Sequence, residues 1–223
     1  MRKAFTLAEL LMVIATIGIV AALTLPNLKN STSDREYVSG LKKCVSNLQT
    51  ALNLAKDKYG NDFAAWTVND KTAAAQGERI AKRVAEFLIV DYDCGLEKEL
   101  RCFSKGDVFT LSGATIVGYD NDENLYKIQL NDKTTLGFTG TDTIKVDLDG
   151  PRSGFNTIGQ DIFTLNIDTD GNITYTPAHS ITTTTVSDCI SGNGFDCASW
   201  VLNYDNTDYV RCSDLSPSKI TCN

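Results

Sequence analysis

The sequence contains little of the chemistry that enzymes and metalloproteins use. His179 is the one histidine among 223 residues, so no second imidazole can join it in a metal or general-base site. None of the seven cysteines forms the CxxC pairs that hold zinc at short spacing, and no Gly-rich phosphate loop or HExxH motif occurs. Ser187, Asp188 and His179 form no recognisable nucleophile arrangement. We therefore predict that the protein is not an enzyme.

Positive charge is also scarce. The chain has 21 Lys and Arg against 28 Asp and Glu, a formal charge of -7. We do not predict general nucleic-acid binding, which relies on basic side chains to replace the counterions around phosphates. The length suits one compact domain of roughly 150 residues plus an extended element. No low-complexity linker and no internal repeat divides it.

The seven cysteines, without zinc spacing, favour disulfides. Disulfides form and persist in oxidising compartments outside the cytoplasm. The sequence should therefore contain a segment that directs export.

A long apolar run, FTLAELLMVIATIGIVAALTL, occupies residues 5–25. As a helix it would be about 31 Å long, enough to span a bilayer. Arg2 and Lys3 precede it, and the positive-inside rule keeps such an N-terminus in the cytoplasm and sends the remainder across. The run is longer than the core of an ordinary secretory signal, and the helical pattern continues beyond it. We predict a single-pass helix, with a plain signal peptide or signal anchor as the alternative.

Glu9 is the one charged residue inside this run. A carboxylate in hydrocarbon costs about 2.5–3.5 kcal/mol even on the lenient insertion scale, so it usually has a partner and a role. If the chain were cut before Phe5, the new ammonium group would lie at the same depth, on this subunit or on a neighbour.

The residues MRKAFTLAELLMVIATIGIVAALTLPNL resemble the N-terminus of type IV prepilins and type II secretion pseudopilins. The resemblance implies that a prepilin peptidase cleaves between Ala4 and Phe5 and methylates the new amine of Phe5. It also implies that Glu9 pairs with an N-terminal amine during assembly and that Pro26 occupies the position where the pilin helix bends or melts. Ala4 departs from the family pattern, because the residue before the cut is usually Gly.

The function implied by this resemblance is that of a structural subunit of a type IV pilus or pilus-like filament. Its partners would be other pilin subunits, prepilin peptidase, the membrane and the inner-membrane assembly machinery. It would lie in the cytoplasmic membrane before assembly and in a cell-surface or periplasmic filament afterwards. A pseudopilin of a type II secretion system and a membrane-anchored extracellular binding domain that never polymerises remain the alternatives. The sequence leaves major or minor status and the ligand of the exposed face open.

The helical pattern continues past Pro26 to Gly60, a plausible stop. Its apolar positions follow the 3-4 spacing of one helical stripe. We therefore predict a leader at 1–4, a long helix at 5–60 that is apolar all round over 5–25 and amphipathic afterwards, and a globular head at 61–223. The stripe comprises Tyr37, Val38, Leu41, Cys44, Val45, Leu48, Leu52, Ala55 and Tyr59.

A second helix is predicted from about Thr72 to Val90, and beyond it the apolar period changes to two. Short runs rich in Val, Ile, Thr and aromatic residues then alternate with Gly, Asn and Asp turns, which is typical of antiparallel strands. The fold class is therefore α+β, a pilin-like long helix packed on an antiparallel sheet. The predicted strands are 108–111, 115–118, 125–130, 144–148, 162–167 and 173–176.

Six cysteines are disulfide candidates whose connectivity the sequence does not give. Pairing between sequence neighbours is the default, whereas a bridge from the 189–197 region to the C-terminal cysteines would resemble the pilin habit of pinning the C-terminal segment. Cys44 lies on the apolar stripe, and we favour a buried, unpaired thiol there. The candidates are Cys94, Cys102, Cys189, Cys197, Cys212 and Cys222.

The acidic segment VDLDGPRSGFNTIGQD is a candidate calcium site, because oxygen ligands from a flexible loop suit calcium. The candidate ligands are Asp147, Asp149, Asn156 and Asp161. The segment lacks the 12-residue spacing and terminal Glu of a known calcium loop, so we favour a plain turn and no cofactor, with calcium as the alternative. A second DxDG, at Asp168 and Asp170, is explained as a hairpin turn.

Overall fold

The structure is a computed structural model of the whole chain. It describes residues 7–96, 102–103, 107–117, 119, 123–152, 156–175, 189–190 and 193–222, without the side chains of 21–33. The chain divides into two compact units, Met1–Glu36 and Tyr37–Asn223.

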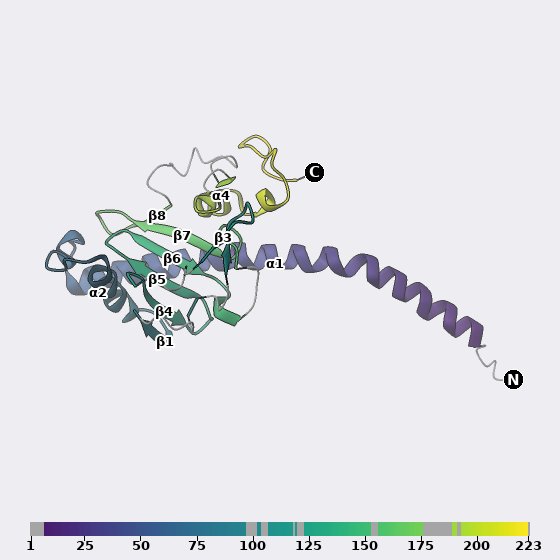
Figure 1. Cartoon of the computed structure of the whole chain (residues 1–223), viewed down its shortest axis with the longest axis horizontal. Helices are drawn as coiled ribbons and strands as arrows, with labels where there is room; N and C mark the ends of the chain where they lie inside the picture. The colour runs from purple at the N-terminus through teal and green to yellow at the C-terminus, as the bar shows by residue number, and fades with distance from the viewer. Residues whose placement is uncertain are drawn as a thin grey trace. The chain divides into compact units, whose positions relative to one another are not determined.

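The first helix, α1, is assigned from Leu7 to Tyr59 (Figure 1). It ends where the sequence predicts, because Gly60 takes a φ of 108° and donates its amide to the Lys56 carbonyl at 2.9 Å. The helical assignment is continuous through Pro26. The bend at Pro26 therefore stays a prediction.

The head contains a six-stranded antiparallel sheet in the order β1-β4-β5-β6-β7-β8 (Figure 1). Consecutive strands from β4 to β8 are neighbours, whereas β1 pairs with β4 across an insertion that contains the small sheet of β2 and β3. The strands are β1 (Val90–Gly95), β2 (Val108–Phe109), β3 (Thr115–Ile116), β4 (Tyr126–Leu130), β5 (Thr135–Thr139), β6 (Thr143–Asp147), β7 (Ile162–Ile167) and β8 (Ile173–Thr174).

One face of the large sheet packs against helices. The stripe of α1 and the buried side of α2 (Ala73–Ala85) form a single apolar cluster with alternate residues of β4 to β7. This arrangement confirms the predicted α+β class, an amphipathic helix covering an antiparallel sheet. The buried stripe residues are Val38, Leu41, Cys44, Leu48, Leu52 and Ala55, and Ala51 beside them is buried too.

The opposite face of the sheet is covered by a second, smaller apolar cluster. Its members come from the insertion between β1 and β4, from the loop before β7 and from the first residue of β7. They are Phe103, Val108, Tyr119, Leu125, Ile158 and Ile162. Side chains that point to this face alternate with those of the helix-covered face, and Asp147 at the end of β6 is one of them.

The C-terminal segment forms a third part of the head. It contains α4 (Cys197–Tyr204) and the 3-10 turn η3 (Asp208–Val210), and the α4 residue Trp200 is fully buried in the main cluster. Figure 1 shows α4 beside β7. Two further 3-10 turns are η1 (Ala64–Trp66) and η2 (Gly150–Arg152).

Three disulfides join neighbouring cysteines of the sequence: Cys94 with Cys102, Cys189 with Cys197, and Cys212 with Cys222. Cys44 is unpaired and buried. Burial raises the pKa of its thiol to about 12, and the charge of Asp132 adds to this shift.

Two expectations for the elements were wrong. The second helix ends at Ala85 instead of Val90, because Val90 begins β1, and β1 was not predicted. Strand β5 was also missed, since the interior Gly137 weakens a strand pattern. The structure explains this glycine: a Cβ there would lie 2.8 Å from the Leu125 side chain, which fills the space.

Two helical glycines provide a matched test of packing. A Cβ on Gly77 of α2 would lie 2.5 Å from the Phe138 backbone oxygen, whereas one on Gly40 of α1 would meet the Leu148 side chain at an ordinary 3.7 Å. We expect Gly77→Ala to lower the free energy of unfolding by about 1–3 kcal/mol through overpacking. Gly40→Ala should leave it unchanged or raise it by up to about 1 kcal/mol through helix propensity. Urea unfolding measures both, and equal effects would contradict this packing.

Candidate functional site

The described N-terminal part of α1 exposes an apolar surface. Glu9, in the first turn, is an exposed carboxylate where the helix dipole favours negative charge. Ala4 and Phe5, the predicted processing residues, lie outside the described residues, as does the Pro26 side chain. The large apolar side chains here are each 52–76% exposed: Leu7, Leu10, Leu11, Met12, Val13, Ile14, Ile17, Ile19 and Val20.

No helix among the residues that the structure describes combines the length and the apolarity needed to cross a membrane.

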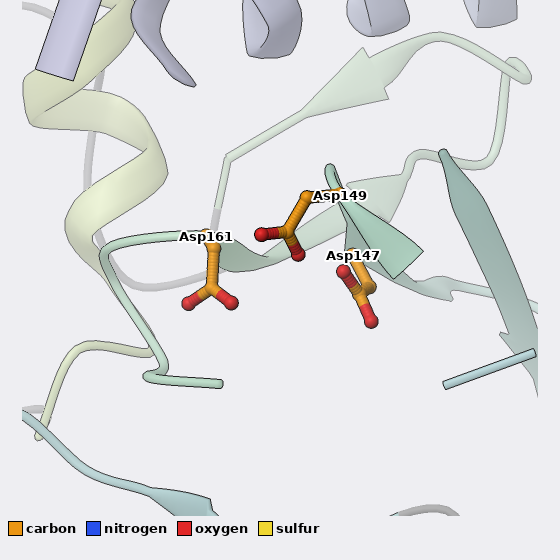
Figure 2. Close-up of side chains that lie close together, drawn as sticks. All are labelled: Asp147, Asp149 and Asp161. Carbon is orange, nitrogen blue, oxygen red and sulfur yellow. The ribbon is translucent and has the colours of Figure 1, made fainter. Parts of the chain in front are cut away.

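A cluster of three carboxylates lies at one end of the sheet. Asp147 is the last residue of β6, Asp149 precedes η2, and Asp161 directly precedes β7. One oxygen from each lies within 4.8 Å of the others. Figure 2 shows Asp149 between the other two, with its carboxyl group turned toward the space between them. The β-ladder explains the juxtaposition, because Asp147 pairs with Ile162, the neighbour of Asp161.

Hydrogen bonds from the backbone and from α1 hold one oxygen of each carboxylate. The Gly150 amide donates to Asp147 Oδ1 at 2.8 Å, and the Thr157 amide donates to Asp161 Oδ1 at 2.6 Å. The Tyr37 hydroxyl donates to Asp149 Oδ2 at 3.3 Å.

The second carboxylate oxygens of Asp147 and Asp161, the Oδ2 atoms, are not held in this way. Both residues are 0% exposed, and neither Oδ2 atom has a hydrogen-bond partner among the residues that the structure describes. A buried polar atom without a partner costs about 1–3 kcal/mol, and more when it is charged. The arrangement therefore calls for a cation or a proton.

Burial and the repulsion between carboxylates raise the pKa values of Asp147 and Asp161. Burial raises the pKa of Asp161 to about 7, and the charge of Asp149 adds to the shift, against hydrogen bonds from the backbone of Thr157. Burial also raises the pKa of Asp147 well above the ordinary range, followed by the charges of Asp161 and Asp149. Three ionised carboxylates at this spacing repel one another strongly in a low-dielectric interior.

Of the four predicted ligands, the structure brings together Asp147, Asp149 and Asp161. Asn156 lies at the start of the same loop, where its carbonyl accepts from the Phe109 amide at 2.8 Å. Its role as a ligand stays a prediction. Tyr37 was predicted only as part of the apolar stripe, and no sequence signal linked its hydroxyl to a residue 112 positions away.

The second acidic motif is the predicted turn. Asp168 accepts hydrogen bonds from the amides of Asp170 at 3.0 Å and Asn172 at 2.7 Å. This is an Asx-type turn between β7 and β8, and Lys56 of α1 donates to the Asp170 carbonyl at 3.0 Å. It provides a natural control for the carboxylate cluster.

One curated protein is similar to part of this chain. Over 80 residues the chain is 39% identical to the Type IV major fimbrial protein FimA of Dichelobacter nodosus, a match that covers 34% of this chain and 51% of that protein. The chain thus spans about half the length of the curated relative it matches. The similarity supports the type IV pilin family, as the N-terminal residues predict. No protein-family model and no solved structure matches the chain.

The raised pKa values predict an unusual pH dependence for metal-depleted protein. A carboxyl with a folded-state pKa above its unfolded value stabilises the fold fully at low pH and loses that stability as pH rises through the folded pKa. For Asp161 this window runs from about 4 to about 7. We expect the free energy of unfolding to fall between pH 5 and pH 7 by up to about 1.4 kcal/mol per pH unit for each proton released.

Urea unfolding of metal-depleted protein at several pH values measures this slope. Asp161→Asn should flatten the slope, whereas Asp170→Asn, in the exposed turn, should not change it. A slope that is equal in wild type and Asp161→Asn would exclude this carboxyl as the cause.

Proposed function

We propose that this chain is a structural subunit of a type IV pilus or pilus-like filament. The observation that supports this most is the exposed apolar surface over residues 7–20, together with Glu9. Contiguous exposed apolar surface of this extent usually marks a site that a partner or a lipid covers. The similarity to a fimbrial protein and the prepilin-like N-terminus favour other subunits as the partners that cover this apolar surface.

In this proposal the prepilin peptidase cuts between Ala4 and Phe5 and methylates the new amine of Phe5. Residues 5–25 hold the subunit in the cytoplasmic membrane until the assembly machinery moves them into the filament core. There the Phe5 amine and the Glu9 carboxylate neutralise each other, in a setting that penalises either charge alone. Pro26 would allow the helix to bend during this transfer.

Two alternatives share these features. A pseudopilin of a type II secretion system would use the same processing and assembly in a periplasmic filament. A membrane-anchored binding domain would keep the helix but would need neither cleavage nor the Glu9 pair.

Substitution of Glu9 distinguishes an assembling subunit from an anchor. Removing one partner of a buried ion pair costs about 3–5 kcal/mol, so Glu9→Ala should reduce sheared surface filaments more than about tenfold. Glu36→Ala, at an exposed position of the same helix, is the matched control and should assemble normally. Ala4→Trp should block processing, which mass spectrometry of the N-terminus detects. Normal filaments from Glu9→Ala, or function of an unprocessed chain, would favour the anchor.

We also propose that Asp147, Asp149 and Asp161 bind one calcium ion. Calcium prefers oxygen ligands at about 2.4 Å, so ligands on opposite sides of one ion lie about 4.8 Å apart. One oxygen from each of the three carboxylates lies within 4.8 Å of the others, a separation that one such shell could accommodate. An ion would also satisfy the buried Oδ2 atoms of Asp147 and Asp161 and reduce the repulsion between the charges.

Thermal unfolding with calcium and with chelator tests this site. At a calcium concentration of 100 Kd we expect a gain of about 2.7 kcal/mol, which is roughly 5–10 °C in Tm. Asp149→Asn should lose this response without destabilising the metal-free protein, because it removes one of three repelling charges. Asp170→Asn should respond like wild type. An unchanged wild-type Tm would remove calcium from the proposal.

A further inference from the structure

The loop that carries Asp161 is held between two segments distant in sequence. On one side it joins β2: the Phe109 amide donates to the Asn156 carbonyl and the Ile158 amide donates to the Phe109 carbonyl, both at 2.8 Å. On the other side it touches the C-terminal segment, at Gly194 and Cys197.

The second contact is backbone against backbone. A Cβ added to Gly194 would lie 2.0 Å from the Ile158 carbonyl oxygen. A Cβ added to Gly159 would lie 2.9 Å from Gly194 Cα and 3.0 Å from Cys197 Sγ. Both glycines have positive φ, 86° and 100°, which other residues rarely adopt. The turn that contains Gly159 and the turn that contains Gly194 can therefore approach this closely only while the Gly194 turn keeps its shape.

The Cys189–Cys197 disulfide fixes that shape. Both cysteines are 0% exposed, and their bond closes the turn that contains Gly194. Within it the Gly194 amide donates to the Cys189 carbonyl at 3.0 Å, and the Cys197 amide donates to the Gly194 carbonyl at 3.2 Å. Tyr209, from η3, holds the same loop through a hydrogen bond from its hydroxyl to the Gly159 carbonyl.

A short turn, residues 157–161, connects Gly159 to the carboxylate of Asp161. The Thr157 carbonyl accepts from the amides of Gln160 and Asp161, at 3.0 and 3.3 Å, and the Thr157 amide donates to Asp161 Oδ1. Gly159 lies inside this turn and donates its own amide to the Ile162 carbonyl at 2.7 Å. A displacement of Gly159 would therefore move Asp161.

We propose that the Cys189–Cys197 disulfide and Tyr209 are positioning groups for the metal ligand Asp161. Calcium and the C-terminal turn then stabilise each other, although they share no atom. The inference rests on the calcium site proposed above. By linkage, the factor by which the disulfide strengthens calcium binding equals the factor by which calcium favours the disulfide over its two thiols.

The Cys212–Cys222 disulfide provides a matched control. It also belongs to the C-terminal segment, but its contacts are with Asp208: the Cys222 amide donates to Asp208 Oδ2 and the Cys212 amide donates to the Asp208 carbonyl, both at 2.9 Å. Tyr204, whose ring packs at a tilt against Trp200 with centroids 4.3 Å apart, is the corresponding control for Tyr209.

Calcium affinity of the full chain in detergent, measured by titration with calcium alone, is the first test. We expect replacement of Cys189 and Cys197 by Ser to weaken binding at least about tenfold, and the same change at Cys212 and Cys222 to alter it less than about twofold. Wild-type affinity in the first variant would overturn the inference while leaving the calcium site standing. Absence of binding in wild type would overturn both.

Tyr209→Phe tests the same coupling without touching a disulfide, in case the first variant fails to fold. It keeps the buried ring and removes the donor to Gly159, so affinity should fall about 2- to 10-fold. Tyr204→Phe should bind like wild type. Equal affinity of Tyr209→Phe and wild type would exclude Tyr209 as a positioning group.

The reciprocal effect is tested by redox equilibrium. Mixtures of dithiothreitol and its cyclic disulfide exchange two electrons and two protons with a protein disulfide, and alkylation followed by peptide mass mapping measures each bond separately. Saturating calcium should shift the Cys189–Cys197 equilibrium toward the disulfide by the ratio of the calcium affinities of the oxidised and reduced forms, and leave Cys212–Cys222 unchanged. No shift, or an equal shift at both bonds, would overturn the proposed coupling.

Discussion

The packing of the α1 stripe, from Val38 to Ala55, on the sheet is the interaction on which the rest of the head depends. It buries the helix-facing residues of four adjacent strands at once and fixes which side chains of each strand point away from the helix. Asp147 points to that other face because Val146 points to the helix. The position of the carboxylate cluster therefore depends on strand register. The register is fixed because the apolar face of each strand must pack against α1.

Local patterns were enough to predict the elements that depend on local chemistry. The end of α1 at Gly60 and the strands from β6 to β8 follow from glycine geometry, β-branched residues and Asp-Gly turns. Strand β5 escaped prediction because Gly137 is explained only by Leu125, a tertiary neighbour. The acidic loop could be identified from its composition. The hydrogen bond from Tyr37 to Asp149 and the contacts of the C-terminal segment with Gly159 could not. These depend on contacts between segments far apart in the chain.

The two functional regions present the same electrostatic problem in different surroundings. Asp147 and Asp161 belong to a packed interior, so their carboxylates lose the water that would otherwise stabilise the charge. Glu9 is exposed in the single chain and would lose its water only inside the proposed filament. A cation is the common solution, supplied in our proposals by a neighbouring amine in one case and by calcium in the other. In these proposals both cations arrive after synthesis, so the carboxylates would favour the processed and metal-bound forms over the isolated chain.

The buried thiol of Cys44 has a consequence for oxidative folding. Six cysteines must pair correctly while a seventh is present, and any thiolate can attack a forming disulfide. With a pKa of about 12, only on the order of one Cys44 side chain in 10⁵ is a thiolate at neutral pH. Packing of α1 on the sheet thus removes the odd nucleophile from the exchange. A chain whose helix has docked before oxidation has three bonds to form and no competing partner, whereas one oxidised earlier is open to mispairing.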